Sequence, residues 1–591
     1  MDSSLHKDCL ILFETAEALE NEAVNDSDTE PYKSRYLARE KWLELAQILQ
    51  ECSSKQEISG LKAAISLNLA KNYFETEERE TGKVEAFKSL RCFDADLNES
   101  NFLEKLPQVH ISRKNLLIFI ECLNYCGYIY ENFGNHFEAE NILRIAADAY
   151  DSSKKEGIPM PPLDASSIVN SLTEGTEKIT KWEELYSKFE NAHTLTLFYL
   201  AQVYQNMGDL HKSAKYCEQT LIRQLQSGQF DPIEWSINCV TLSQFYLNEA
   251  SKRMDIAEIH ANLHVSRECL CIAQSIVNKN NTVSERFFRC QADLHRCWVK
   301  YCLCVLELSK KQVQYSEEIG ISDESEESAS SKNEVAKIFP HVEGAKTLEE
   351  QISYKLVKNF VDARAVFLKG QSSLLKAQKF YTLHDWCTDY AELIQDYSKL
   401  FHFLSFFEGQ LERKCCMQKR RIDMLRHLAD LLNRQFYLVL WRQLQFELGA
   451  AYKSLIIIKL DLHTQQKEQV VQKAAKINNL VDKAIATFQG LFDSYGVDID
   501  NQQKLFSQDD ESVIVNCQMS MGQLHSKKIV ANNKENVENL QKNLKHYDWV
   551  LSYCSARPVS QERLSQEWAL CQANCELIGK RIVQLTSQIS S

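Results

Sequence analysis

The sequence predicts an all-α fold, and three observations support this prediction. The 591 residues include only 17 Gly and 8 Pro, too few for turn-dense all-β architectures. Apolar residues recur at spacings of three and four along most of the chain, as they do in amphipathic helices. No alternating strand pattern of useful length accompanies them. The helical spacing covers segments 61–93, 113–150, 186–227, 233–250, 265–278, 285–310, 347–383, 386–412, 434–461 and 468–495.

The best-defined helical pair is centred on a glycine-closed turn. Gly127 is a small residue that lets two helices approach closely, and Tyr130 follows on the same helix face. Gly134 ends the first helix in a turn, and Ala139 and Ala146 are small contact positions of the second helix. These offsets are those of the tetratricopeptide (TPR) helix–turn–helix unit.

A second complete unit has the same offsets. Its corresponding residues are Ala201, Tyr204, Gly208 and Ser213. One such pattern arises easily by chance in a long helix, but two complete copies favour a repeat architecture over an irregular helical bundle.

Partial units support the same interpretation. They begin at Ala70, Ser243 and Gly449, the last with a return helix around Phe488. The unit at Ser243 resumes only after an extension at 250–264. Stacked repeats bury a continuous core, so we predict a TPR-containing, right-handed α-solenoid.

Two interruptions divide the predicted solenoid. Residues 151–182 contain three prolines and many Ser and Thr residues, which predicts a long loop between repeats. Residues 314–346 are acidic and Ser-rich, which is typical of a flexible linker. We therefore expect an N-terminal helical half at 1–313 and a C-terminal helical half at 347–591.

Charge and cysteine content limit the possible partners and compartments. The chain has 81 acidic and 68 basic residues, a net charge of −13 and a pI near 5.7. This balance disfavours nucleic-acid binding and favours a partner with a basic surface. The 20 cysteines form no Cys-x-x-Cys pair, and neither a secretory signal nor an apolar run of membrane-spanning length occurs. These features predict a reduced, cytosolic protein.

Signatures of catalysis are absent from the sequence. No glycine-rich phosphate loop, nucleophile elbow or zinc-protease motif occurs, so we expect no catalytic residues, cofactor or metal site. His260 and His264 lie one helical turn apart but lack a third ligand, and we interpret them as exposed helix surface. The basic stretch 413–426 is interpreted as the solvated face of a helix whose other face is buried.

The repeat register also predicts a partner-binding strip. First helices of stacked pairs line the concave face of a solenoid, and such faces bind extended segments or helices of other proteins. Each first helix has a small residue at its contact with the second helix, namely Gly127, Ala201 or Ser243. The residues two before and one after this small residue are expected to project near the concave face. The alternative is that these side chains pack between repeats and bond internally. In three successive units the predicted pairs are Tyr125 and Tyr128, Tyr199 and Gln202, and Thr241 and Gln244.

At these residues the chain becomes similar to a known family. The segments that carry the similarity are 30–36, 198–205, 232–238, 241–246, 296–302 and 406–425. In this order along nearly the whole chain they resemble the kinesin-binding protein (KIF-binding protein) family. The extension at 250–264 departs from the family pattern.

The resemblance implies a TPR-containing α-solenoid in two halves that binds the motor domains of a subset of kinesins. It implies binding at the helix with which these motors grip microtubules, and roles in microtubule organisation, axon growth and mitochondrial transport. The partner-binding residues that it implies are Tyr199, Gln202, Thr241 and Gln244. We expect a monomer in the cytoplasm, associated with the cytoskeleton.

Two other classes of function remain open. A TPR scaffold or co-chaperone adaptor that binds peptide segments requires a Lys/Asn/Arg clamp along the groove. An enzyme hidden on a helical scaffold requires clustered titratable residues, and the sequence shows no convincing cluster. For the peptide-binding adaptor, the clamp is not assembled, because the aligned groove positions are Leu67, Asn68, Lys71, Asn124, Tyr125, Phe198 and Tyr199.

Overall fold

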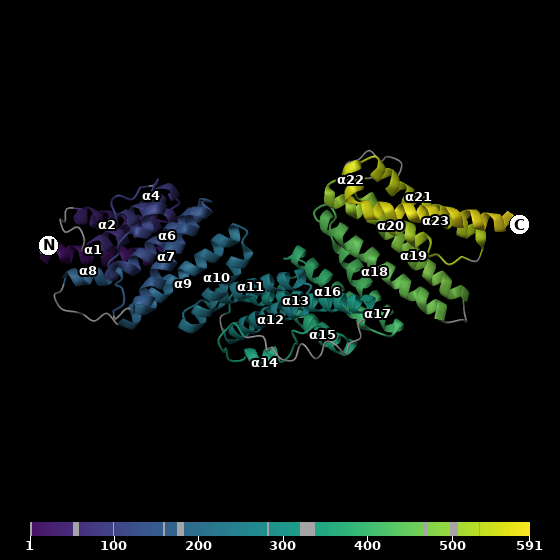
Figure 1. Ribbon diagram of the computed structural model, residues 1–591, viewed down its shortest axis with the longest axis horizontal. Helices are drawn as coiled ribbons and strands as arrows, with labels where there is room; N and C mark the ends of the chain where they lie inside the picture. The colour runs from purple at the N-terminus through teal and green to yellow at the C-terminus, as the bar shows by residue number, and fades with distance from the viewer. Residues whose placement is uncertain are drawn as a thin grey trace. The chain divides into compact units, whose positions relative to one another are not determined.

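Helices account for the regular structure of the protein (Figure 1). The computed structural model describes residues 3–50, 58–98, 100–157, 160–173, 182–280, 283–319, 337–465, 470–496, 506–530 and 532–590. Within these ranges the secondary structure contains no strand, so the all-α prediction is confirmed. The α-helices are α1 (Ser3–Glu22), α2 (Lys33–Gln50), α3 (Ser59–Glu75), α4 (Arg79–Arg91), α5 (Phe102–Lys105), α6 (Leu116–Asn132), α7 (His136–Glu156), α8 (Ala165–Thr173), α9 (Trp182–Asn206), α10 (Leu210–Ser227), α11 (Pro232–Lys252), α12 (Ile256–Lys279), α13 (Glu285–Ile319), α14 (Ala345–Glu349), α15 (Phe360–Ala377), α16 (Cys387–Phe407), α17 (Leu411–Leu431), α18 (Leu438–Gln465), α19 (Val470–Asp493), α20 (Gln508–His525), α21 (Asn533–Ser555), α22 (Pro558–Arg563) and α23 (Ser565–Ser590). Short 3₁₀ turns are η1 (Ala23–Asn25), η2 (Leu106–Gln108) and η3 (Arg113–Asn115).

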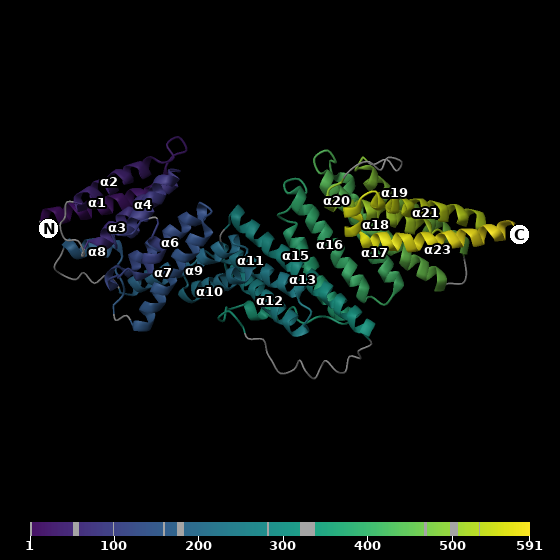
Figure 2. The same cartoon turned by 45° about the horizontal axis from the view of Figure 1, so that its top comes forward.

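The chain forms two compact units. The first comprises Met1–Phe245 with Ile338–Pro340, and the second comprises Tyr246–Lys337 with His341–Ser591. The boundary therefore falls within α11. In each unit, successive helices run as antiparallel pairs (Figure 2).

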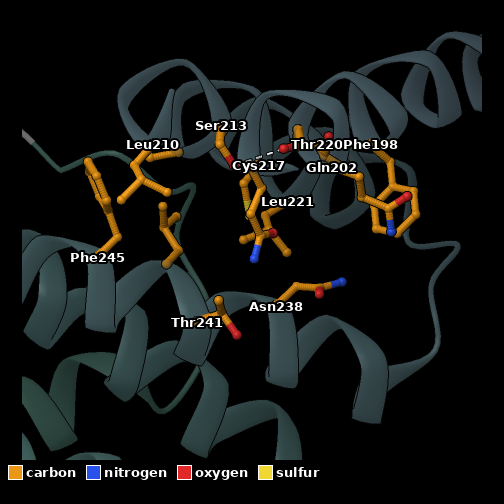
Figure 3. A pocket seen from close by; sticks show the side chains of 14 residues that line it. Phe198, Gln202, Leu210, Ser213, Cys217, Thr220, Leu221, Asn238, Thr241 and Phe245 are labelled. Atoms are coloured by element: carbon orange, nitrogen blue, oxygen red, sulfur yellow. Dashed lines mark hydrogen bonds between the residues drawn. The ribbon is translucent and has the colours of Figure 1, made fainter. Parts of the chain in front are cut away.

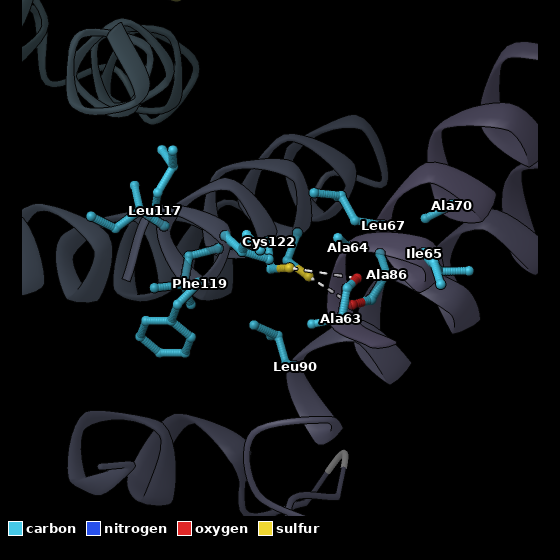
Figure 4. Close-up of a cluster of buried hydrophobic side chains, with 14 of the residues drawn as sticks. Ala63, Ala64, Ile65, Leu67, Ala70, Ala86, Leu90, Leu117, Phe119 and Cys122 are labelled. Carbon is cyan, nitrogen blue, oxygen red and sulfur yellow. Dashed lines mark hydrogen bonds between the residues drawn. The ribbon is translucent and has the colours of Figure 1, made fainter. Parts of the chain in front are cut away.

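The described part of the first unit contains the helical hairpins α1–α2, α3–α4, α6–α7 and α9–α10, with α5 and α8 between them. First helices of successive hairpins also contact one another, α3 with α6 and α6 with α9. Buried alanines of α3 and α4 and apolar residues of α6 meet in the core (Figure 4). Among them, burial raises the pKa of the Cys122 thiol to about 12, so this cysteine packs as a small neutral group.

Small residues and turn glycines explain the close pairing of these helices. A Cβ at Gly127 would lie 2.6 Å from Cγ of Leu143, so α6 and α7 meet at a position where a larger side chain does not fit. Gly134 and Gly208 close the α6–α7 and α9–α10 turns with φ of +77° and +81°, a region that favours glycine. Both complete TPR units predicted from the sequence are therefore present.

The second unit repeats the same construction. Its hairpins include α16–α17, α18–α19 and α20–α21, and α23 packs on α21. A Cβ at Gly449 of α18 would lie 2.7 Å from Cε1 of Phe488 on α19. The predicted return helix of this partial unit is thus confirmed.

The predicted long loop at 151–182 contains helical structure. Helix α7 continues to Glu156, and α8 occupies Ala165–Thr173. Asp164 supports the start of α8, since its Oδ1 accepts a hydrogen bond from the backbone N–H of Ser167 at 2.8 Å. The buried side chains of Ile168 and Val169 then fix α8 against the core. Residues 158–159 and 174–181 of the predicted loop lie outside the described residues.

The predicted linker at 314–346 coincides only in part with the described structure. Helix α13 continues to Ile319, and residues 320–336 lie outside the described residues. Phe339 is buried, with its ring 6.2 Å from that of Trp235. The division into an N-terminal helical half at 1–313 and a C-terminal helical half at 347–591 stays a prediction.

The interpretation of His260 and His264 as exposed helix surface is wrong. Helix α12 begins at Ile256, so most of the 250–264 extension is helical. Nε2 of His260 accepts a hydrogen bond from the backbone N–H of Leu356 at 3.1 Å, and buried His264 lies edge-on to Tyr354 at 4.9 Å. Burial lowers the pKa of both histidines, so they hold the 350–358 segment in their neutral forms.

The interpretation of the basic stretch 413–426 is confirmed for most of its bases and is wrong for Arg421. Arg413, Lys419 and Arg420 of α17 are exposed, as expected for a solvated face. Arg421 is buried instead, and its Nη1 donates to Oε1 of Gln418 at 2.7 Å. Burial lowers the pKa of this guanidinium to about 10.

The contact at Gly449 gives a stability prediction. Gly449→Val is expected to lower the free energy of unfolding by about 2–3 kcal/mol, because the added methyl groups collide with the Phe488 ring. Gly490→Ala on α19 is the matched control, since a Cβ there meets nothing within 4 Å. The control is expected to be neutral or to stabilise by up to about 1 kcal/mol. Urea unfolding followed by circular dichroism measures both, and an unchanged midpoint for Gly449→Val would contradict the predicted packing.

Candidate partner-binding surface

The predicted tyrosines form a row of touching rings across two first helices. Tyr125 and Tyr128 of α6 have ring centroids 5.8 Å apart, and Tyr128 lies 5.5 Å from Tyr199 of α9. Phe74 of α3 extends the row, with its centroid 5.6 Å from that of Tyr128. All three tyrosines are half-buried. The structure therefore brings these three predicted residues together.

The hydroxyl groups of this row are available for a partner. None of the three tyrosine hydroxyls hydrogen-bonds to another residue of the described ranges. Partial burial raises the pKa of Tyr199 to about 12, so its hydroxyl stays protonated and can donate or accept. The alternative for these side chains is met in part, because the three rings pack against the core between hairpins while, among the described residues, their hydroxyl groups bond to no other residue.

Gln202 and Thr241 lie at the mouth of one cavity. Both side chains are exposed, and they line a cavity of about 190 Å³ between α9, α10 and α11 (Figure 3). Gln202 makes no hydrogen bond with any residue that the structure describes. Thr241 donates from Oγ1 to the backbone oxygen of Ile237 at 3.0 Å and keeps its lone pairs free.

Gln244 is placed apart from the other predicted residues. It is half-buried, it does not line the cavity, and its Nε2 is buried without a hydrogen-bond partner. Gln244 follows Thr241 by three residues on α11, but the side-chain amide turns towards the protein. Leaving an amide nitrogen unpaired is costly, so this side chain has a reason to reorient when a partner binds.

Two aromatic residues outside the predicted partner-binding pairs complete the surface. Phe198 lines the cavity and lies 5.8 Å from the Tyr199 ring, so it connects the tyrosine row to the cavity. Phe245 forms another wall of the cavity. Both residues directly adjoin predicted positions, Tyr199 and Gln244, and this adjacency of aromatic and polar residues was the available signal.

Hydrogen bonds between helices hold the surface in place. Asn124 of α6 is 2% exposed and spans to α9, donating to the backbone oxygen of Ala192 and accepting from Oγ1 of Thr196, both at 2.8 Å. Oγ of Ser213 on α10 donates to the backbone oxygen of Ala201 at 2.8 Å. Nε1 of Trp235 on α11 donates to the backbone oxygen of Leu221 at 3.1 Å.

The same contacts bear on the peptide-clamp alternative. A clamp for acidic peptides needs an amide that points into the groove. Asn124 occupies such a register position, but both ends of its amide are bonded inside the protein. Lys71, the basic residue at an aligned position, is exposed, and its Nζ lies 6.0 Å from the Tyr125 ring. Among the seven aligned positions, the structure therefore offers one lysine and no bonding-competent clamp asparagine at Asn124.

Side-chain placement also bears on metal binding and on membrane crossing. Over the ranges given above, no three His, Cys, Asp or Glu side chains are arranged to hold a metal ion. Within those ranges no helix combines the length and the apolar character that a membrane crossing requires.

The helices pair with TPR spacing and turn geometry, and the pairs stack so that their first helices present an aromatic and polar strip. These features define a helical-repeat protein of the protein-binding type. The family model described as "KIF-1 binding protein C terminal" matches residues 233–585. By this match and by the relatives described next, the chain belongs to the KIF-binding protein family.

Similar proteins match along nearly the whole chain. The KIF-binding protein of Gallus gallus is 30% identical over 599 residues, covering 96% of this chain and 95% of the relative. That of Homo sapiens is 30% identical over 558 residues, covering 89% and 84%. That of Drosophila melanogaster is 27% identical over 613 residues, covering 98% and 97%. A solved structure named Kinesin binding protein (KBP) is 26% identical, covers 96% of this chain and 97% of its own, and has a TM-score of 0.62.

Proposed function

We propose that this protein is a non-catalytic binding protein for kinesin motor domains. The observation that carries the proposal is the similarity, over almost the full length, to proteins named KIF-binding protein and to a solved structure named Kinesin binding protein (KBP). The aromatic and polar strip of the first unit has the side chains that a surface needs to bind a helix of another protein. Tyrosine is enriched at protein interfaces because its ring packs while its hydroxyl bonds.

The proposed mechanism is competition for one surface of the motor. Tyr199, Gln202, Thr241 and Gln244, with Tyr125 and Tyr128 beside them, would contact the helix with which the kinesin grips its microtubule. A motor held in this way cannot attach to its track. Through this control of attachment the protein would support microtubule organisation, axon growth and mitochondrial transport, acting as a cytoplasmic, cytoskeleton-associated monomer.

The direct test is a pull-down with purified kinesin motor domains, one at a time, with the full chain as bait. We expect a subset of motors to bind and, once bound, to lose microtubule co-sedimentation. If no motor domain binds, or if bound motors still sediment with microtubules, the proposed function is wrong.

Electrostatic steering gives a second measurable consequence. The chain carries a net charge of −13, and a kinesin surface that grips acidic tubulin is expected to be basic. The association rate constant is therefore expected to fall about tenfold between roughly 0.05 and 0.3 M NaCl, while the dissociation rate changes little. Stopped-flow measurement over this range tests it, and an association rate that ignores salt would contradict steering.

A further inference from the structure

The cavity beside the strip has an apolar interior. Its walls include the rings of Phe198 and Phe245, and the buried side chains of Ala214, Leu221 and Leu242 also line it. At about 190 Å³ it is smaller than the roughly 300 Å³ of a typical small-molecule site. The space therefore suits one apolar side chain better than a metabolite.

The mouth of the cavity is polar. Gln202, Asn238 and Thr241 surround it, and Figure 3 shows Gln202 on one side and Asn238 and Thr241 on the facing helix. Gln202 and Asn238 have no hydrogen-bond partner within the described residues. An apolar pocket ringed by polar groups is the arrangement found at binding hot spots, where the polar groups keep water from the buried contact.

We propose that the partner inserts one apolar side chain into this cavity, and that this side chain anchors the complex. The inference rests on the proposed function and specifies what the motor domain must present: an aliphatic or methionine side chain on its contact helix, with hydrogen-bonding neighbours for Gln202 and Thr241. Continuity with the tyrosine row supports this occupant, because Phe198 borders both the cavity and Tyr199. A motor with a polar residue at the anchor position would leave the cavity empty and bind weakly.

Two variants fill the cavity from different helices. Asn238→Trp places a ring at the mouth and removes no hydrogen bond within the described structure, and Cys217→Phe fills the cavity from half-buried Cys217 on α10. With the motor domain that binds best in the panel above, each variant is expected to weaken binding at least tenfold by isothermal titration calorimetry. Lys215→Trp adds the same ring at an exposed position of α10 that does not line the cavity, so it is the matched control, with an expected change of less than about threefold.

The outcomes separate this inference from the proposed function. If both filling variants fold and bind like the wild type while Gln202→Ala with Thr241→Ala loses binding, the strip is used and the anchor is wrong. If neither the filling variants nor the strip variant changes binding, the proposed site itself is wrong. Circular dichroism and thermal melting of each variant establish folding.

A measurement on the unmodified chain covers the case in which a filling variant does not fold. The Cys217 thiol lines the cavity, whereas exposed Cys416 lies on α17 of the second unit. Iodoacetamide modification of each cysteine, followed by peptide mass spectrometry, is expected to slow at least tenfold at Cys217 when the motor domain is bound, with the rate at Cys416 as reference. Equal rates at Cys217 with and without the motor would overturn the proposal.

Discussion

The double variant Tyr199→Ala with Gln202→Ala is expected to weaken kinesin motor binding at least about 30-fold, which corresponds to the roughly 2 kcal/mol of a hot spot. Tyr199 continues the row of rings from Tyr128, and Gln202 stands exposed at the cavity mouth without an internal hydrogen bond. Truncating both removes contact area and a hydrogen-bonding group from the centre of the proposed surface. Surface plasmon resonance with an immobilised motor domain gives the affinity.

The pair on α11 allows a finer comparison. Thr241 is exposed, whereas the Gln244 amide nitrogen is buried without a partner. Thr241→Ala is therefore expected to weaken binding severalfold. Gln244→Ala should do so only if the amide turns outward in the complex. Lys215→Ala on α10 is the control, because Lys215 is exposed and does not line the cavity.

Unchanged affinity of the Tyr199 and Gln202 double variant, with a normal circular dichroism spectrum, would contradict the proposed surface.

The repeat architecture was predictable because its physical causes are local. Close helix contact demands a small residue, and the turn that follows demands a residue that tolerates positive φ. Gly127 and Gly134 meet these two demands seven residues apart in one unit, and Ala201 and Gly208 do so in the next. Such requirements leave a fixed spacing in the sequence, whatever covers the helices from outside.

The N-terminal helix α1 shows where the same signal weakens. Cys9, Phe13 and Ala16 are buried at spacings of four and three, as helical periodicity requires. Residues 9–13 are all apolar, so the sequence does not show which face of the helix is buried, and Ile11 within this run is exposed. Its burial depends on packing against α2 and α8, which the sequence does not reveal.

The remaining differences arise from contacts between segments far apart in the sequence. His260 and His264 are covered by residues 354–356, and Arg421 by α16 residues such as Ser398. Periodicity identifies a helix face but does not identify the distant segment that covers it. The candidate surface shows the same limit, since register placed Gln244 beside Thr241 while local packing turned its amide inward.

Acidification from pH 7.5 to pH 5 is expected to destabilise both units through histidines that are buried in the neutral form. Burial lowers the pKa of His193 to about 3 and that of His295 to about 4. Nearby Arg223 adds to the effect at His193, and Lys376 does so at His295. In the unfolded chain, each histidine has its ordinary pKa of about 6.5. Between these values the unfolded state binds more protons, so stability falls as pH falls below about 6.5.

Through each of these two histidines, the free energy of unfolding is expected to fall by about 2 kcal/mol at pH 5, because the pKa of the histidine in the unfolded chain lies about 1.5 pH units above that pH. His193→Phe keeps a ring stacked on Tyr150, which lies 3.7 Å from the imidazole, and removes the titrating group. His295→Phe is the matched change in the second unit, and Nδ1 has no hydrogen-bond partner in either histidine. Urea unfolding at both pH values should therefore show that each variant loses about 2 kcal/mol less than the wild type on acidification. If a variant keeps the full pH dependence of the wild type, its histidine is protonated in the folded state, and the neutral buried imidazole assigned to that unit is wrong.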